Sequence, residues 1–414
     1  MTNGMKAVLP LVLGAAVCGC GGGDAGDWAG TVTDSAGVAV VTNPADAEWT
    51  LRAAPRLVPE LDIGEVEGEG AYQFGQVIGL DVTPAGDIVV LDQQAAQVRV
   101  FDRAGRHLRT IGKPGGGPGE FSAMTMAVRA GGGDTVYVAD MMRQRIVGLA
   151  GDGVEFASYP LAIERGIPLR FQPAPDGRLA VQVRRMALPG STSQEPPRDF
   201  IIVTDLKGEA ADTIAELESG ATFSFGGGSG GGVEMRVFSS EPMWTMLEDG
   251  RLVRGRTDLY RFEVFSPAGT LERVINRPVE ARPVTLEDQG AYKDLMRRLV
   301  TRQQPAVTPQ MLDMLLGAMK FADHFPVYAN LMGGPDNTLW VQRFPASLEF
   351  PEGTEPDLQN LSIPDWDVFD AEGRLLGMVT LPDRFTPLRV VGDVIYGLQL
   401  DDLDVQHVVR LRIE

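Results

Sequence analysis

The sequence predicts an all-β fold in which one strand-turn-strand unit is repeated radially. The first copy spans residues 86–105 and the second spans residues 133–153, and in each an apolar run ends at an aspartate, Asp92 and Asp140. These two aspartates are 48 residues apart. Short β-type runs that recur at such a period, separated by Gly and Asp, are typical of a radial repeat and not of a layered α/β fold.

The pattern recurs with lower fidelity along the rest of the chain, so we expect six units in all. A hairpin turn of the Asp-Gly kind precedes the second strand expected in each unit, because Gly and Asp tolerate the positive φ of tight turns. The four later units cover residues 176–208, 249–269, 336–373 and 392–411.

The six units differ in how they end. Five finish with a further strand, over residues 108–111, 154–157, 211–215, 271–275 and 375–380. The sixth has none before the chain ends, so we expect the N-terminal run 61–64 to complete it and to close the ring. Closure removes a sheet edge that would otherwise favour aggregation.

The best-preserved copy resembles the NHL-type propeller repeat. It carries an apolar pair before Asp92, the run 98–102 that contains Arg99 and Phe101, and a Gly-rich turn over 112–119. The similarity is good over residues 75–160 and weak over residues 168–414. It implies a six-bladed β-propeller with an N-terminal strand closing the last blade. It implies little about function, because these propellers include binding modules, scaffolds and a few lyases and lactonases.

Composition limits the possible partners. The chain has 414 residues, 44% of them hydrophobic, which is ample for a large core. Its formal net charge of −19 would repel phosphate backbones, so we expect no nucleic-acid partner.

The N-terminus is typical of a targeting segment. Lys6 precedes an apolar run, 7–17, that is too short to span a bilayer as a helix. The following Val-Cys-Gly-Cys sequence resembles a bacterial lipobox, which implies cleavage before Cys20 and lipid attachment to its sulfur. The alternative is a secretory signal cut elsewhere, with Cys20 left as a thiol. Met5 is an alternative initiator to Met1.

These features divide the chain into a signal peptide (1–19), a tether (20–36) and a propeller (37–414). After cleavage Cys20 would be the sole cysteine, so we expect neither an internal disulfide nor a Cys-based metal or nucleophile site. We expect a protein of the cell envelope, held at a membrane by its lipid, on the periplasmic side or at the cell surface.

Four long insertions are expected on one face of the propeller, because each follows a second or a fourth strand of its blade. Loops on a rigid scaffold commonly carry function, so this face is the candidate binding face. The segment 276–325 has helical periodicity and predicts a helical hairpin, either packed on the propeller for stability or placed over the central channel as a lid. The four insertions are 184–199, 216–242, 276–325 and 343–365.

Motifs for catalysis are weak, and we assign no catalytic residue. The three histidines, His107, His324 and His407, fall in separate parts of the repeat and are not expected to converge on a metal. Residues 227–231 match G-x-S-x-G, and 226–231 match G-x-G-x-x-G. Both lie in a Gly/Ser tract without the strand-to-helix turn that such motifs need.

Two sets of charged residues have alternative interpretations. Asp92 and Asp140 could contribute to a Ca²⁺ site in the channel or cap turns within their blades. Arg184, Arg185 and Arg343 adjoin two long loops and are the candidate ligand-binding residues. They would bind an anionic ligand or pair with nearby Asp and Glu.

We therefore expect a non-enzymatic, lipid-anchored propeller that binds a protein, peptide or glycan through its loop-rich face, without a cofactor. The alternative is a propeller enzyme of the lyase or lactonase type that uses a divalent cation in its channel.

Overall fold

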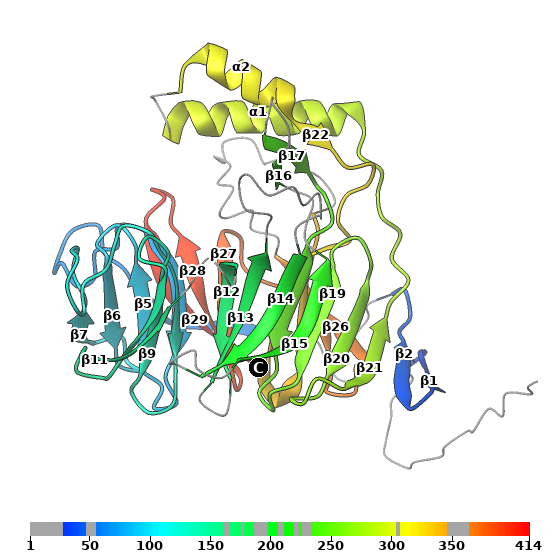
Figure 1. Cartoon of the computed structure of the whole chain (residues 1–414), viewed down its shortest axis with the longest axis horizontal. Coiled ribbons are helices and arrows are strands. Elements are labelled where there is room, and N and C mark those ends of the chain that lie inside the picture. The colour runs from blue at the N-terminus through cyan, green and yellow to red at the C-terminus, as the bar shows by residue number, and fades with distance from the viewer. Residues whose placement is uncertain are drawn as a thin grey trace, which may run out of the picture.

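The chain is a six-bladed β-propeller (Figure 1), as the sequence predicts. Its computed structural model describes residues 28–46, 55–160, 166–174, 178–185, 198–205, 211–218, 223–225, 233–303, 307–345 and 364–414. Within these residues the chain is mostly β-strand, with two α-helices.

The first three blades are four-stranded antiparallel sheets in sequence order. Blade 1 contains β4 (Val77–Val82), β5 (Ile88–Asp92), β6 (Gln97–Phe101) and β7 (His107–Ile111). Blade 2 contains β8 (Thr125–Ala130), β9 (Val136–Asp140), β10 (Arg145–Leu149) and β11 (Glu155–Pro160). Blade 3 contains β12 (Ile167–Pro173), β13 (Leu179–Arg185), β14 (Arg198–Thr204) and β15 (Ala211–Glu218).

Two of the last three blades, blades 4 and 6, include strands from the N-terminal segment. Blade 4 contains β18 (Pro242–Met246), β19 (Leu252–Arg256), β20 (Arg261–Phe265) and β21 (Leu271–Asn276), extended by two N-terminal strands. Blade 5 contains β23 (Tyr328–Gly333), the 3₁₀ turn Pro335–Asn337, β24 (Leu339–Arg343), β25 (Asp365–Phe369) and β26 (Leu375–Thr380). Blade 6 contains β27 (Phe385–Val391), β28 (Val394–Leu400), β29 (Gln406–Ile413) and β3 (Leu57–Ile63).

The ring closes as predicted. Strand β3 pairs antiparallel with β29, with Ile63 opposite Val408 and Leu61 opposite Arg410. Ile63 is 2% exposed and packs in the apolar cluster that joins blade 6 to blade 1. The strand that precedes blade 1 and the final strand β29 are therefore joined in one sheet.

One N-terminal element, a hairpin beside blade 4, was not predicted. Strands β1 (Thr31–Ser35) and β2 (Val38–Thr42) extend blade 4, because β2 pairs parallel with β21. The boundary expected at residue 36 therefore falls inside a hairpin, and residues 31–35 are a strand and not part of a tether. The signal peptide (1–19) and Cys20 lie outside the described residues.

Asn43 fixes this hairpin to two blades. Its buried amide donates to the Asn276 carbonyl of blade 4 at 3.2 Å and to the Gly373 carbonyl of blade 5 at 2.9 Å. Its oxygen accepts the backbone N–H of Leu375 at 2.6 Å. Because a buried amide is costly unless its polar atoms are paired, these bonds specify where the hairpin docks.

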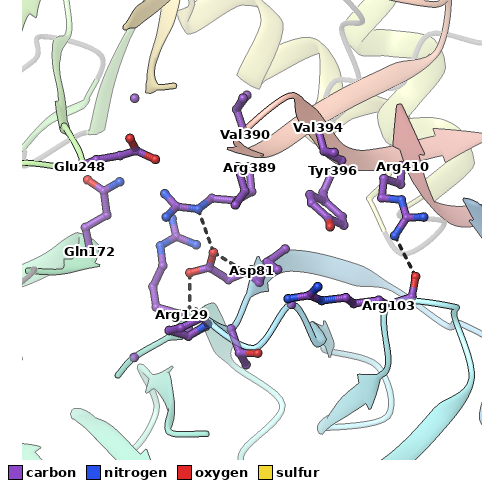
Figure 2. Close-up of a pocket in the computed structure, with 18 of the residues that line it drawn as sticks. Asp81, Arg103, Arg129, Gln172, Glu248, Arg389, Val390, Val394, Tyr396 and Arg410 are labelled. Atoms are coloured by element: carbon purple, nitrogen blue, oxygen red, sulfur yellow. Dashed lines mark hydrogen bonds and ion pairs between the residues drawn. The ribbon is translucent and has the colours of Figure 1, made fainter. Parts of the chain in front are cut away.

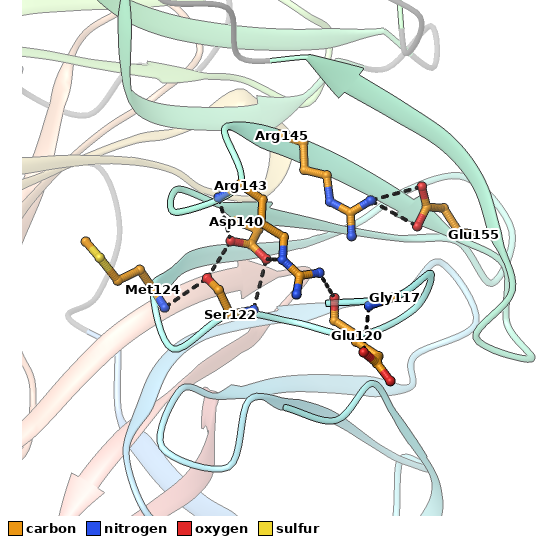
Figure 3. A network of polar contacts seen from close by, with 8 residues as sticks. All are labelled: Gly117, Glu120, Ser122, Met124, Asp140, Arg143, Arg145 and Glu155. Atoms are coloured by element: carbon orange, nitrogen blue, oxygen red, sulfur yellow. Dashed lines mark hydrogen bonds and ion pairs between the residues drawn. The ribbon is translucent and has the colours of Figure 1, made fainter. Parts of the chain in front are cut away.

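The aspartates of the repeat cap loops within their blades. Asp140 accepts the Ser122 N–H at 3.0 Å and the Ser122 hydroxyl at 2.5 Å, and Arg143 lies beside it (Figure 3). Asp92 accepts the backbone N–H groups of Gly75 and Gln76 and pairs with Arg99 at 3.1 Å. The capping interpretation is confirmed for both aspartates.

Two insertions combine into one small module, which we call the cap: β16 (Phe223–Phe225), β17 (Val233–Val237), α1 (Leu286–Gln303), α2 (Pro309–Ala318) and β22 (Lys320–Phe321). The cap lies over one face of the propeller (Figure 1). Strand β17 pairs parallel with β22, and the apolar face of α2 packs in a cluster with Val237. The predicted helices are confirmed, but they pack against the other insertion, a partner that the sequence analysis did not name.

Candidate functional site

A polar cavity of about 860 Å³ opens at the mouth of the central channel (Figure 2). It lies where the innermost strands end, so it belongs to the face of the tight turns, opposite the cap. Asp81 of β4, Arg129 of β8, Gln172 of β12 and Arg389 of β27 line it. These side chains come from four blades, and only the closed ring brings them together.

Hydrogen bonds between blades explain several of these positions. Asp81 accepts the backbone N–H of Ala130 in blade 2 at 3.0 Å, and Gln172 accepts that of Met246 in blade 4 at 2.9 Å. Thr245 likewise accepts the N–H of Gly333 in blade 5 at 3.1 Å. An acceptor near the end of one innermost strand thus holds the next blade.

Arg129 occupies the same position in blade 2 that Asp81 occupies in blade 1. Each residue stands one place before the last residue of its strand and pairs with the adjoining strand in the same register. A guanidinium group has no acceptor, so Arg129 cannot make the bond between blades that Asp81 makes. One of its nitrogens donates to the Val128 carbonyl at 2.8 Å.

Two arginines lie beside the Asp81 carboxylate in the channel, and a third arginine lies near one of them. The Arg389 Nε lies 3.2 Å from Asp81, and the guanidinium groups of Arg389 and Arg129 lie side by side next to that carboxylate (Figure 2). Arg170 of β12 is the third, and its guanidinium lies 5.7 Å from the ring centre of the buried Trp244. Burial and, to a smaller extent, the nearby positive charge of Arg129 together lower the pKa of Arg170 to about 10. Burial also lowers the pKa of Arg129, which Asp81 opposes.

An apolar ring adjoins the arginines. Five innermost strands shift register at the same place, between residues 77/79, 125/127, 168/170, 328/330 and 387/389. Four of the residues at these shifts, Ile78, Met126, Leu169 and Leu388, line a second cavity of about 200 Å³. Arg129 lines both cavities and Arg170 lines the smaller one, so the polar and apolar parts of the channel adjoin.

Several charged side chains at the rim of the larger cavity already have partners. Glu60 lies between Arg410 and Arg412, and Arg412 also contacts Asp393 at 2.8 Å. Glu248 accepts the backbone N–H of Asp336 at 3.1 Å. Among the described residues that line the two cavities, Arg103, Arg129 and Arg170 have no carboxylate within ion-pair distance, although the negative charge of Asp81 acts on Arg129.

This donor set does not fit a divalent cation. Ca²⁺ takes six to eight oxygen ligands, whereas the carboxylate at the centre of the channel, Asp81, lies beside the guanidinium groups of Arg389 and Arg129. Across the described part of the chain no cluster of three or more His, Cys, Asp or Glu residues has metal-site geometry.

The arginines proposed from sequence lie elsewhere and are engaged within their blades. Arg184 makes two bonds to Asp199, at 2.8 and 2.9 Å, and this contact raises its pKa. Arg343 contacts Asp367 at 2.8 Å. Arg185 lies over the Phe200 ring at 4.4 Å. Pairing with local carboxylates is what the structure shows for the first two, and a ligand role for all three stays a prediction.

The histidines also lie apart, on β7, next to the cap and on β29. His407 contacts Asp62 at 2.6 Å, whereas His107 bonds to Thr110. The Gly/Ser tract at 226–231 lies outside the described residues.

Sequence reasoning missed Arg129, Arg170 and Arg389, although a signal was present. The triplet Pro-Leu-Arg occurs at 168–170 and again at 387–389, in the innermost strands of blades 3 and 6. A repeated arginine in an otherwise apolar inner strand marks a position that faces the channel.

Comparisons with known proteins agree with the fold. The family model DUF5128, described as a 6-bladed beta-propeller, matches residues 72–180. No curated protein matches the chain. No helix in the described ranges is long and apolar enough to cross a membrane.

Three solved structures illustrate the similarity. A member of the DUF4221 family from Bacteroides vulgatus is 13% identical, with a TM-score of 0.51, over 87% of this chain and 98% of that one. A putative exported protein from Bacteroides fragilis is 11% identical, with a TM-score of 0.48, over 91% and 99%. A virginiamycin B lyase from Staphylococcus aureus is 11% identical, with a TM-score of 0.43, over 86% and 99%. The first of these, at 13% identity, indicates a shared fold only.

Proposed function

We propose that this propeller is a non-enzymatic, lipid-anchored binding protein of the cell envelope that binds another protein through its cap. The observation that carries the proposal is that α2 is apolar on two sides. Leu312 and Leu316 are buried against the rest of the cap, whereas Met311, Met314 and Leu315 are exposed. The outer three stand at i, i+3 and i+4, so they share one face of the helix.

The chemistry of this outer face favours a protein or peptide over a glycan. Met314 is 67% exposed, and flexible thioethers adapt to apolar side chains of a partner. A row of Met and Leu offers no hydrogen bonds to sugar hydroxyls, but it matches the apolar face of a helix or an extended peptide. Two of the four insertions assigned to the loop-rich face build this module, which supports that face as the binding face.

The proposed anchor would hold the propeller close to a membrane. If the chain is cleaved before Cys20, eight residues, 20–27, separate the lipid from Trp28, where the described residues begin. Eight residues span at most about 28 Å. Trp28 is itself attached to blade 4, because its indole N–H donates to Asn43 at 3.2 Å. A partner of the cap would therefore be another envelope protein near the same membrane.

Fractionation tests the anchor. The natural protein should sediment with membranes, and Cys20→Ser should move it to the soluble envelope fraction with the same melting temperature. A Cys20→Ser protein that still sediments with membranes would refute lipid attachment at this residue.

Capture experiments test the binding face. Met314→Lys should abolish retention of the partner on immobilised protein while melting temperature and circular dichroism stay unchanged. Val154→Lys is the matched control, because Val154 is 60% exposed in the turn from β10 to β11, on the face opposite the cap. Equal retention by both variants would contradict the proposal. A lyase or lactonase that uses a divalent cation stays the alternative, and the channel's donor set does not favour it.

A further inference from the structure

We propose that the central channel binds a small organic anion. Its carboxylate or phosphate group would be held by Arg129, Arg170 and Arg389, and its apolar part would lie against the adjoining apolar ring. This site is separate from the cap and does not depend on the function proposed for the cap.

Arg129 is the first element of the site, because it stands where other blades have an acceptor that holds the next blade. The matching residues Asp81, Gln172 and Thr245 each accept a backbone N–H from the next blade. An arginine side chain at this position cannot accept a hydrogen bond, so it cannot make the corresponding bond between blades 2 and 3. Its long side chain instead reaches into the cavity, where it lies beside Arg389 (Figure 2).

The second element is the imbalance of charge. Asp81 already accepts the Ala130 N–H and pairs with Arg389, so its single negative charge cannot neutralise all three guanidinium groups. Arg170 has no carboxylate within ion-pair distance among the described residues, and its neighbours include Trp244 and Arg129. Guanidinium groups held close together and partly out of water attract an anion, and their planar fork suits carboxylate and phosphate oxygens.

The third element is the apolar ring. Met126 and Leu169 are exposed to the channel although they belong to innermost strands. With Ile78 and Leu388 they form an apolar wall next to Arg129 and Arg170. A ligand that satisfies both parts carries its charge at one end and hydrocarbon at the other.

Calorimetric titration of the folded protein with sodium acetate, inorganic phosphate and sodium octanoate tests the proposal. Octanoate should bind at least about tenfold more tightly than acetate, because its chain reaches the apolar ring. Arg129→Gln and Arg170→Gln should each weaken octanoate binding at least tenfold. Leu169→Asn should remove the advantage of octanoate over acetate and leave acetate binding unchanged. Phosphate binding at least as tight as that of octanoate would identify a phosphate group, rather than a carboxylate, as the preferred charged end.

Arg170→Lys controls for folding and for charge. It keeps the positive charge but loses the planar fork, so its affinity should fall between the natural protein and Arg170→Gln. Circular dichroism and melting temperature establish that each variant is folded. Absence of binding by all three probes to the natural protein, or equal affinities across folded variants, would overturn the proposal.

Discussion

The guanidinium Nε of Arg389 lies 3.2 Å from a carboxylate oxygen of Asp81, which joins the innermost strand of the last blade to that of the first. The other oxygen of Asp81 accepts the N–H of Ala130 in blade 2 at 3.0 Å. One buried carboxylate therefore links three consecutive blades at the centre of the ring. It also provides the negative charge beside Arg129 in the channel.

Asp81→Asn separates the two roles of this carboxylate. The amide oxygen can still accept the Ala130 N–H, but the variant leaves Arg389 and Arg129 without a counter-charge. We expect the free energy of unfolding in urea to fall by about 1–3 kcal/mol, less than for a fully buried pair because Arg389 is partly exposed. Adding Arg389→Gln should recover part of the loss, since the unpaired cation is removed. Strictly additive losses would show that the two side chains do not interact.

Ile63→Ala tests closure of the ring. Ile63 is buried at the junction of blades 6 and 1, so its truncation should cost about 2–5 kcal/mol of unfolding free energy in urea denaturation. Val66→Ala is the control, because Val66 is 58% exposed just beyond the strand and should change stability by less than about 0.5 kcal/mol. A similar loss from both substitutions would mean that β3 does not close the ring.

Stability should fall in acid through carboxylates that cap turns. The backbone N–H of Val405 lowers the pKa of Asp401, with help from Leu403, and the N–H of Arg106 does the same for Asp102. Because their pKa values are lower in the folded state, their contribution is complete above the unfolded pKa, about 3.9. This contribution to stability is lost as the pH falls below the unfolded pKa and through the lower pKa values of the folded state. Urea midpoints measured from pH 6 to pH 2.5 should fall less for Asp401→Asn than for the natural protein. Parallel curves for the two proteins would count against this role.

Removal of divalent cations should leave the protein unchanged. The arginine-rich channel disfavours Ca²⁺, so the melting temperature should be the same with and without a chelator. A fall of several degrees that added Ca²⁺ reverses would instead support the cation-dependent alternative.

The parts of this fold that depend on local sequence were predictable. Hairpin turns, the aspartates at 92 and 140, and the spare strand near residues 61–64 all carry local patterns, and the structure confirms each. The β1–β2 hairpin also has such a pattern, with Ala36 and Gly37 at positive φ in a two-residue turn between a largely polar run and an apolar run. Its docking beside β21 was not predictable, because it rests on Asn43 contacts with residues more than 200 positions away.

The channel arginines show the limit of reasoning from sequence. Arg129, Arg170 and Arg389 lie in separate blades and meet only when the ring closes. Their sequence neighbours indicate strands, whereas their shared environment depends on how the inner strands of different blades are arranged around the channel. Arg184 and Arg343 were proposed for their place beside long loops, and the structure shows each with an aspartate of its own blade.

Site-specific photo-crosslinking in intact cells tests the proposed binding face most directly. A photoreactive amino acid placed at position 314, on the outer side of α2, should yield a discrete crosslinked product with another envelope protein. The same amino acid at position 154, comparably exposed on the opposite face, should yield none. Equal products from both positions, or a product from position 154 alone, would contradict the account.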